Sequence, residues 1–251
     1  MDGRQSTSIE KSVLILKQLA VPPYEYKAGE LARKLGMNRS SVYRILQVLK
    51  DCDLVISDKG GDYYKVGPEM YHIGTTYLYN NNFHSKLIDI LSEISDIIKE
   101  SVGMAVMDGD KIMSLIEIEV HQPMKLNDVP GRYYPPNKGN YGKVLMAYQD
   151  PEYIERTLSG RVFEKTFYNT LTTKEELLAE YARIRDRGYS FSVDELGIDI
   201  LGVGIPIFGE KGRIKACVAV GFYRSEGWED KLHRVKDILL GYQGQIERNL
   251  P

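Results

Sequence analysis

The sequence has few of the residues that hold extracellular or metal-bound proteins together. Its 251 residues include two cysteines, one tryptophan and four histidines. Cys52 and Cys217 form no CxxC pair, so neither a disulfide framework nor a zinc site is indicated, and we expect two buried, reduced thiols. No apolar run is long enough to span a membrane, and the first residues lack the hydrophobic block of a signal peptide. We therefore expect a cytoplasmic protein with no metal and no cofactor.

The chain also lacks an overall excess of positive charge, because its formal net charge is -2. The charges are unevenly distributed, however. Residues 1–66 contain 11 basic and 8 acidic residues, whereas the remainder contains 22 and 27. Residues 27–44 contain five basic residues and a single acid, Glu30. A local basic region on an otherwise acidic chain is typical of a protein that presents one face to DNA.

Familiar catalytic motifs are missing as well. The sequence has no G-x-S-x-G elbow, no H-E-x-x-H, no phosphate-binding loop and no dinucleotide-binding glycine motif between a strand and a helix. A hydrolase centred on Asp194 and Glu195 would need a third group, and no histidine lies near them in the sequence. We therefore predict that the protein is not an enzyme.

Residues 27–51 have the pattern of a helix-turn-helix. Ala32 lies four residues before Gly36, and a small residue followed by a glycine permits a sharp turn between two packed helices. After the turn, four apolar residues recur with helical spacing, and polar residues occupy the opposite face. Asn38 directly precedes this second helix and can cap its first amides. The pattern predicts a recognition helix that enters the major groove.

Two short strands, residues 54–57 and 62–66, are predicted after that helix. The segment Asp58-Lys59-Gly60-Gly61 joins them, and its glycines suit a tight hairpin. A helix-turn-helix followed by a hairpin is the winged variant, and Lys59 at the tip would contact phosphate without specifying sequence. Taken alone, the second helix could also be an ordinary amphipathic surface helix. The residues predicted to contact DNA are Lys27, Lys34, Asn38, Arg39, Ser40, Ser41, Tyr43, Arg44, Gln47 and Lys59.

The sequence predicts two domains and a connecting segment. We assign residues 1–67 to the winged helix-turn-helix, residues 68–82 to a linker helix and residues 83–251 to a second domain. In the second domain, helical patterns alternate with strand patterns, and tight turns such as Asp108-Gly109-Asp110 join several strands. This arrangement predicts an α+β domain built on a mostly antiparallel sheet.

From Ser8 to about Asn249 the chain resembles the IclR-type (isocitrate lyase regulator type) bacterial transcriptional regulators. The N-terminal likeness rests on ELARKLGMNRSSVYRILQVLKDCDLV and KVGPEMYHIG, and the C-terminal likeness on GRYYPPNKGNYGKVLMAY and GYSFSVDELGIDILGVGIPIF. The resemblance implies a GAF-like, or profilin-like, C-terminal domain for effector binding and oligomerisation. It also implies a homodimer or homotetramer that binds a palindromic or repeated operator in double-stranded DNA.

The resemblance further implies a small-molecule site between the Gly/Pro loop, the helix after it, the acidic segment and two strands. Relatives that bind small carboxylates have hydroxyl or thiol side chains at three strand positions where this sequence has only glycine or alanine. We therefore expect a larger cavity and a ligand larger than pyruvate or glyoxylate, an aromatic or sugar-derived organic acid. The amides of the helix beginning near Tyr141 would bind its carboxylate, with Lys138 or Lys143 adding charge. The implied residues are Asn137, Lys138, Gly139, Asn140, Tyr141, Asp194, Glu195, Gly202, Gly204, Ala219 and Gly221.

Two interpretations of the second domain stay open at this point. In the first, an effector changes operator affinity through a coupling free energy of about 1–3 kcal/mol. In the alternative, the protein binds DNA independently of any ligand, and the second domain only oligomerises. The pair Asp194 and Glu195 could equally be solvated surface acids. Stabilisation of residues 83–251 against heat by a metabolite would separate the two interpretations.

Overall fold

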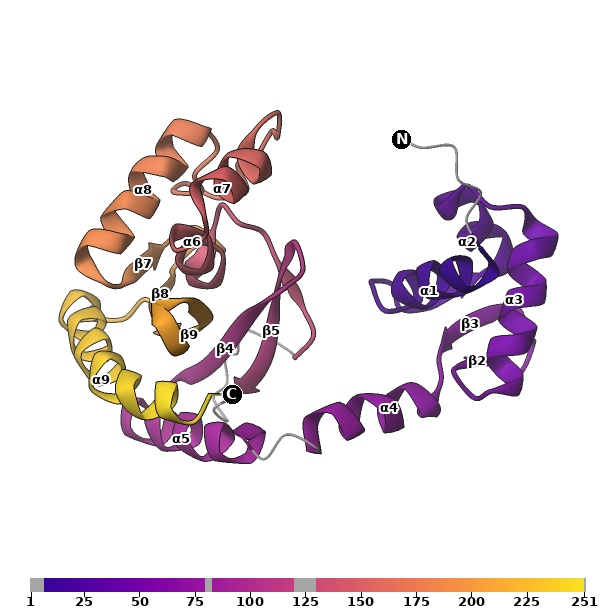
Figure 1. Ribbon diagram of the computed structural model, residues 1–251, viewed down its shortest axis with the longest axis horizontal. Coiled ribbons are helices and arrows are strands. Elements are labelled where there is room, and N and C mark those ends of the chain that lie inside the picture. Colours follow the sequence, from indigo (N-terminus) through magenta and orange to yellow (C-terminus); the bar gives the residue numbers. More distant parts are fainter. Residues whose placement is uncertain (1–6, 80–82, 120–129, 251) are drawn as a thin grey trace. The chain divides into compact units, whose positions relative to one another are not determined.

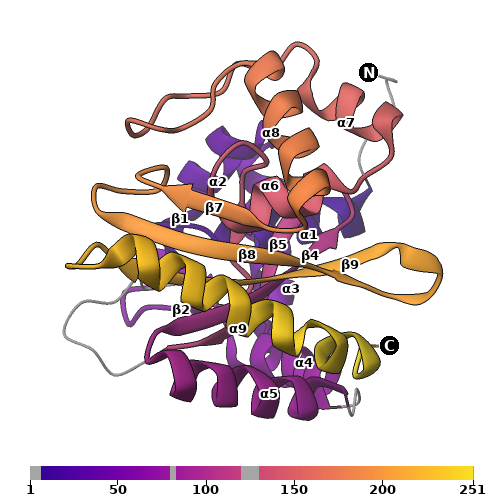
Figure 2. The same ribbon diagram turned by 90° about the vertical axis from the view of Figure 1, so that its left-hand side faces the viewer.

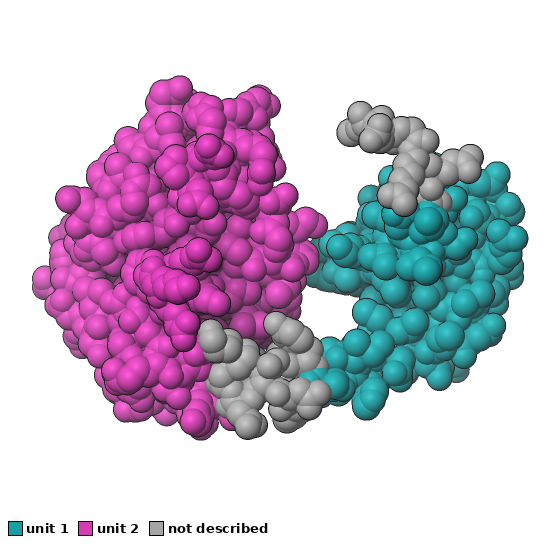
Figure 3. Space-filling view, viewed as in Figure 1, with its two compact units in different colours: residues 1–81 teal, residues 82–251 magenta. Residues whose placement is uncertain are grey.

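The computed structural model describes residues 7–79, 83–119 and 130–250. The chain forms two compact units, residues 1–81 and 82–251, which Figure 3 shows in different colours. The helix at residues 68–79 belongs to the first unit, while the division into residues 1–67, 68–82 and 83–251 stays a prediction. In the described part of the chain, no helix has both the length and the apolar composition needed to cross a membrane.

The first unit packs three helices against a small antiparallel sheet with strand order β1-β3-β2. Its core includes Ile15, Leu31 and Leu46, one from each of the three packed helices, and all three are fully buried. The strand β1 was not predicted, because two residues are too short to show a period. Its elements (Figure 1) are α1 (Ser8–Leu19), β1 (Tyr26–Lys27), α2 (Ala28–Leu35), α3 (Arg39–Asp51), β2 (Val55–Ser57), β3 (Tyr63–Val66) and α4 (Pro68–Tyr79).

The turn between α2 and α3 has the geometry that the sequence predicted. Gly36 has a φ of 63°, in the left-handed region where glycine is favoured. Met37 N–H then donates to the carbonyl of Ala32 at 2.9 Å, which closes the end of α2. The Asn38 side chain accepts from Ser40 N–H at 2.9 Å and caps α3. The helix-turn-helix and its cap are thus confirmed.

The predicted wing is also present. Strands β2 and β3 pair antiparallel, and the turn between them is organised by Asp58, whose carboxylate accepts from the N–H groups of Asp62 and Tyr63 at 2.9 and 3.1 Å. Gly61 has a φ of 73° in this turn, which explains the glycine there. The hairpin therefore holds Lys59 at its exposed tip.

The second unit is an α+β fold on one antiparallel sheet with strand order β6-β5-β4-β9-β8-β7, as predicted. Several element bounds agree with the sequence pattern, including the helix that Gly188 ends in a left-handed conformation. Its elements are α5 (Phe83–Ile98), β4 (Ser101–Asp108), β5 (Lys111–Ile118), β6 (Tyr133–Tyr134), α6 (Gly139–Ala147), α7 (Pro151–Leu158), α8 (Lys174–Arg187), β7 (Ser190–Val193), β8 (Ile200–Phe208), η1 (Glu210–Gly212), β9 (Ile214–Tyr223) and α9 (Trp228–Arg248).

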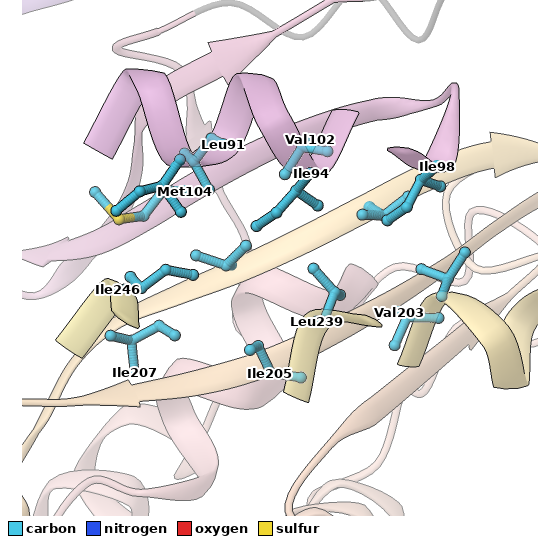
Figure 4. Close-up of a cluster of buried hydrophobic side chains, with 14 of the residues drawn as sticks. Leu91, Ile94, Ile98, Val102, Met104, Val203, Ile205, Ile207, Leu239 and Ile246 are labelled. Atoms are coloured by element: carbon cyan, nitrogen blue, oxygen red, sulfur yellow. The ribbon is translucent and has the colours of Figure 1, made fainter. Parts of the chain in front are cut away.

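Helices cover both faces of this sheet. Helices α5 and α9 lie on one face, and α6, α7 and α8 pack on the other (Figure 2). On the first face, Val203, Ile205 and Ile207 of β8 point toward α5 and α9, as Figure 4 shows. Because side chains alternate along a strand, Gly202 and Gly204 face the opposite side, where α6 packs. The two glycines allow this helix to approach the sheet closely.

Some details differ from the sequence-based expectations. Helix α6 begins at Gly139, two residues before the start near Tyr141 that the sequence predicted. Cys217 is buried as expected, but Cys52 is exposed. The expectation for Cys52 was wrong because this residue is the C-cap of α3, beyond the last buried position of that helix. The expected loop from residue 127 lies partly outside the described residues.

The close approach of α6 predicts a penalty for a methyl group at Gly204. A Cβ there would lie 2.6 Å from Cβ of Asn140 and 3.4 Å from the Cys217 sulfur. We expect Gly204→Ala to lower the free energy of unfolding by about 1–3 kcal/mol, measured by urea denaturation. Gly241→Ala is the matched control, because a Cβ on that helical glycine would meet nothing within 4 Å. Equal stability of the two variants would contradict the packing argument.

Candidate nucleic-acid interface and small-molecule cavity

Helix α3 presents a polar face to solvent. Val42, Ile45, Leu46 and Leu49 are buried in the core of the first unit, so the opposite side of the helix is turned outward. Arginine, serine and tyrosine side chains can all donate hydrogen bonds to phosphates or base edges. Among the α3 residues predicted to contact DNA, four are exposed, namely Arg39, Ser40, Tyr43 and Arg44. Ser41 and Gln47 are partly buried.

The other predicted DNA contacts surround this helix. Lys27 lies 4.8 Å from the ring centre of Tyr63 in the wing and 3.9 Å from a carboxylate oxygen of Asp62. Lys34 is exposed on α2, with its ammonium 5.6 Å from the ring centre of Tyr26. Lys59 is exposed at the wing tip. Basic groups therefore occur on α2, α3 and the wing of a single unit.

The Asn38 side chain caps helix α3, which limits its availability for direct contacts with DNA. Its side-chain oxygen accepts from both the backbone N–H and the hydroxyl of Ser40, at 2.9 and 2.7 Å. These bonds hold the first turn of α3, so Asn38 positions the recognition helix whether or not it also touches DNA. Lys50, which was not among the predicted contacts, donates to Ser57 at 2.8 Å and connects α3 to the wing.

The second unit contains a cavity of about 60 Å³ beside the N-terminus of α6. Strands β4, β5, β8 and β9 form its other walls. The cavity brings together six of the residues expected to bind an effector: Gly139, Asn140, Tyr141, Gly202, Ala219 and Gly221. The sequence-based prediction missed the side chains of Ser101, Glu117, Glu119, Ser192, Leu196 and Ile200, which also line it.

Glu117 is the most informative of the missed residues. The Tyr141 hydroxyl donates to Glu117 at 3.1 Å, and the Ser114 hydroxyl donates to the same carboxylate oxygen at 2.5 Å. Gly103 makes room for this group, because a Cβ there would lie 1.9 Å from the Tyr141 hydroxyl. An acid within the otherwise apolar end of β5 is the sequence signal that could have identified it.

Five expected effector residues do not line the cavity, and four of these have partners elsewhere in the unit. The Asn137 side chain is buried and donates to the carbonyl of Leu171 at 2.8 Å. Lys138 donates to the Thr166 hydroxyl at 2.8 Å and lines a neighbouring hollow of about 310 Å³. Tyr134, Leu196 and Ile200 line both this hollow and the cavity, so the two spaces adjoin. The remaining three are Asp194, Glu195 and Gly204.

Glu195 forms a buried ion pair with Lys143. Both side chains are less than 10% exposed, and Lys143 also donates to the carbonyl of Phe191 at 2.8 Å. The second Glu195 oxygen accepts from Gly139 N–H at 2.8 Å, at the start of α6. Burial raises the pKa of the Glu195 carboxyl, and the Lys143 ammonium opposes this shift.

This ion pair corrects part of the expected anion site. Lys143 and the Gly139 amide were expected to face a ligand carboxylate, but both bind the protein's own Glu195. The physical reason is that a lysine buried this deeply needs a buried counter-charge. Glu180 adds a further carboxylate 3.8 Å from the Lys143 ammonium.

Asp194 holds the turn that follows β7. Its φ is 53°, and its carboxylate lies 2.6 Å from the Arg224 guanidinium and accepts from Asp199 N–H at 2.8 Å. Arg224 also pairs with Asp199 at 2.9 Å. The acidic pair is therefore neither a pair of solvated surface acids nor part of the cavity wall. Its two carboxylates fix the segment that carries Leu196 and Ile200.

The strand glycines have a different effect from the one expected. A Cβ on Gly202 would lie 2.6 Å from the Asn140 amide nitrogen, and a Cβ on Gly204 would lie 2.6 Å from the Asn140 Cβ. The expectation that missing side chains at these strand positions enlarge the cavity was therefore wrong for Gly202. The Asn140 side chain occupies that space and lies 3.0 Å from the Ser190 hydroxyl.

Comparison with known proteins covers nearly the whole chain. The IclR helix-turn-helix domain matches residues 8–59, and the bacterial transcriptional regulator IclR C-terminal domain matches residues 75–248. The HTH-type transcriptional regulator KdgR of Dickeya chrysanthemi is 26% identical over 204 residues, which are 81% of this chain and 67% of that protein.

Solved structures share the fold over the full length. The crystal structure of an IclR-type transcriptional regulator from Alicyclobacillus acidocaldarius has a TM-score of 0.87 at 20% identity, and the match covers 98% of this chain and 99% of that one. The crystal structure of an IclR homologue from Microbacterium hydrocarbonoxydans, complexed with 4-hydroxybenzoate, has a TM-score of 0.82 at 16% identity. The match covers 97% of this chain and 99% of that one.

The buried pair predicts a stability loss that depends on pH. We expect Lys143→Met to lower the free energy of unfolding by about 3–5 kcal/mol at pH 7, because Glu195 then remains buried without its counter-charge. Without the lysine, the Gly139 N–H alone opposes the pKa-raising influences of burial and Glu180, so Glu195 takes up a proton on folding as the pH falls. The loss should therefore be smaller at pH 5 than at pH 7 in chemical denaturation.

A double variant provides the control for this prediction. Lys143→Met combined with Glu195→Gln removes both charges, so it should recover part of the lost stability and lose the pH dependence. A Lys143→Met variant whose stability loss is the same at both pH values would contradict the assignment of Glu195 as the unpaired acid.

Proposed function

The chain belongs to the IclR family of bacterial transcriptional regulators, and from that membership we propose that it binds a palindromic or repeated operator as a homodimer or homotetramer. The family match confirms the predicted DNA-binding regulator and the prediction that the protein is not an enzyme. The observation that carries the operator proposal is the outward polar face of α3, flanked by basic groups on α2 and the wing. Because a regulator of this family acts on bacterial DNA, we place the protein in the cytoplasm.

The proposed contacts divide into positioning and sequence-reading groups. Ser40, Tyr43, Arg44 and Gln47 lie on α3, which in a helix-turn-helix enters the major groove. Arg44 is the strongest candidate for reading a base, because its guanidinium can bind a guanine edge through two hydrogen bonds. Phosphate contacts are assigned to the basic groups around α3 and to the hydroxyl in its first turn, namely Lys27, Lys34, Arg39, Ser41 and Lys59.

The operator symmetry follows from the number of recognition helices. Each chain presents one α3, and a single helix reads only a short half-site. Two copies related by a two-fold axis would place two such helices on an inverted repeat, about one helical turn or a multiple of it apart. This reasoning supports at least a dimer on DNA.

We assign effector binding to the cavity and the adjoining hollow together. The cavity alone holds only a few water molecules, because each needs roughly 10–15 Å³. A larger acid would place its apolar or hydroxylated body beside Tyr134 and Tyr141, and its carboxylate in the hollow beside Lys138 and Arg132. The 4-hydroxybenzoate bound by a relative of the same fold agrees with an aromatic acid of this size.

Regulation then follows from linkage between the two sites. An effector changes operator affinity only by the difference between its affinities for the DNA-binding and the released states. The competing proposal is that the protein binds DNA independently of ligand and uses the second unit only to oligomerise. The small volume of the cavity is the observation that favours this alternative.

The operator proposal is tested by selecting bound duplexes from a random DNA pool at moderate salt. We expect the full-length protein to enrich an inverted repeat. Arg44→Ala should weaken binding to it by about 1–3 kcal/mol and lose preference at one base pair of each half-site. Binding of the selected duplex and of single-base variants, measured at one salt concentration, gives both quantities.

Two further substitutions serve as controls for Arg44. Lys59→Ala in the wing should leave the preferred sequence unchanged. It should reduce the slope of the logarithm of the binding constant against the logarithm of the salt concentration by about 0.9, as expected for one lost phosphate contact. Lys17→Ala, an exposed position on α1, should change neither quantity. Loss of affinity without loss of base preference in Arg44→Ala would reassign Arg44 to phosphate.

The effector proposal is tested by thermal unfolding of the full-length protein with matched acids. We expect 4-hydroxybenzoate or galacturonate to raise the melting temperature more than pyruvate or glyoxylate does, because binding to the folded state stabilises it. Lys138→Gln should reduce this response, whereas Lys211→Gln, exposed in the β8–β9 turn, should not. Equal shifts with the small acids would contradict the size argument, and no shift with any acid would favour the ligand-independent alternative.

A further inference from the structure

A second hollow in the same unit is separate from the cavity and larger than it. This groove has a volume of about 420 Å³, within the range of roughly 300–1,000 Å³ that is usual for small-molecule sites. It lies between the β4–β5 turn, the segment from Tyr133 to Pro136, and the chain at and after the end of α7. Of the residues proposed above to bind the effector, Tyr134 alone lines it, so the groove requires its own explanation.

The floor of the groove is apolar and rigid. Ile112 and Met146 are 3% and 1% exposed, and both belong to the core between the sheet and helices α6 to α8. Phe163 packs on the same core, and Val162 beside it is 97% exposed. Val162 and Phe163 thus extend the apolar floor to the protein surface, and contiguous apolar surface of this kind can mark an interaction site.

The rim of the groove carries positive charge. Lys111 and Arg161 are both exposed there, and within the described residues neither forms an ion pair. The acids close to the groove already have partners. Asp110 lies 3.6 Å from the Arg156 guanidinium, and Asp108 accepts from the Tyr133 hydroxyl at 2.9 Å. An anion at the rim would therefore meet two exposed cations that form no ion pair with either of these acids.

A tyrosine forms the wall between the groove and the cavity. Tyr134 lines both spaces, and its ring meets the Tyr141 ring edge-on at a centroid distance of 5.0 Å. Tyr133 lines the groove and not the cavity. The Lys111 ammonium lies 4.7 Å from the centre of its ring. The aromatic wall and the cation thus form one continuous surface.

From this geometry we propose that the groove is a second ligand site, which binds a small organic anion with an aromatic or aliphatic body. The body packs on Ile112 and Met146, and the anionic group lies at the rim near Lys111 and Arg161. Apart from Tyr134 in the shared wall, the groove is lined by other residues than the cavity, and its cations are Lys111 and Arg161 rather than Lys138 and Arg132. Its existence does not depend on whether the cavity binds an effector.

The proposal is tested by calorimetric titration of the full-length protein with naphthalene-2-carboxylate and with its neutral amide. We expect the carboxylate to bind about tenfold more tightly than the amide, and a Lys111→Glu, Arg161→Glu double variant to weaken carboxylate binding by about tenfold or more. Arg234→Glu reverses an exposed charge on α9, which packs on the opposite face of the sheet, and should bind like the wild type.

Two further measurements keep the result decisive. Arg161→Gln removes one rim charge conservatively and should weaken binding by a smaller factor if the double variant proves unstable. Glu117→Gln removes a carboxylate from the cavity and should leave groove binding unchanged. Stronger binding in Glu117→Gln, with no effect of the rim variants, would place the probe in the cavity and overturn the proposal. The absence of measurable binding of naphthalene-2-carboxylate to the wild-type protein at millimolar concentration would also overturn the proposal.

Discussion

The arrangement of the second unit depends on the buried ion pair between Lys143 and Glu195. The lysine comes from α6 and the glutamate from the segment after β7, so the pair joins two elements that are 52 residues apart. Because each charge is costly to bury alone, neither element can shift without exposing the other charge to an apolar environment. The bond from Gly139 N–H to the same carboxylate adds a directional constraint at the first residue of α6. The pair therefore sets where α6 begins relative to the sheet.

The cavity takes its shape from this constraint. With α6 fixed, the Asn140 side chain lies against the two glycines of β8, and the Tyr141 hydroxyl reaches Glu117 on β5. Leu196 directly follows Glu195 in the sequence, so the same ion pair also places an apolar side chain at the cavity wall. The residues that hold the site together are thus distinct from those that line it. This distinction is why Glu195 looks like a ligand residue in the sequence while serving as a support in the structure.

Much of the fold could be predicted because it depends on local patterns. The turn at Gly36, the cap at Asn38 and the wing each follow from neighbouring residues. The candidate site was harder to predict from the sequence, because its geometry depends on residue pairs that are far apart in the chain. Nothing local indicates that Glu195 would meet Lys143, or that β5 would carry Glu117 to the Tyr141 hydroxyl. A resemblance to a family indicated the region, but the role of each side chain required the tertiary contacts.

The same contacts indicate which part of the site can respond to a ligand. On one side, the segment after β7 is fixed by Glu195 and by the pairing of Asp194 with Arg224. On the other side, β6 is a two-residue edge strand that carries Tyr134, and besides its two pairs with β5 the backbone bonds between Ser114 and residues 131–132 hold this edge. Local opening costs least where few backbone bonds and buried contacts must be broken. A ligand that packs on Tyr134 would therefore act on the weakly held edge of the sheet and leave α6 in place, so β6 is the element through which binding can be converted into a change of structure.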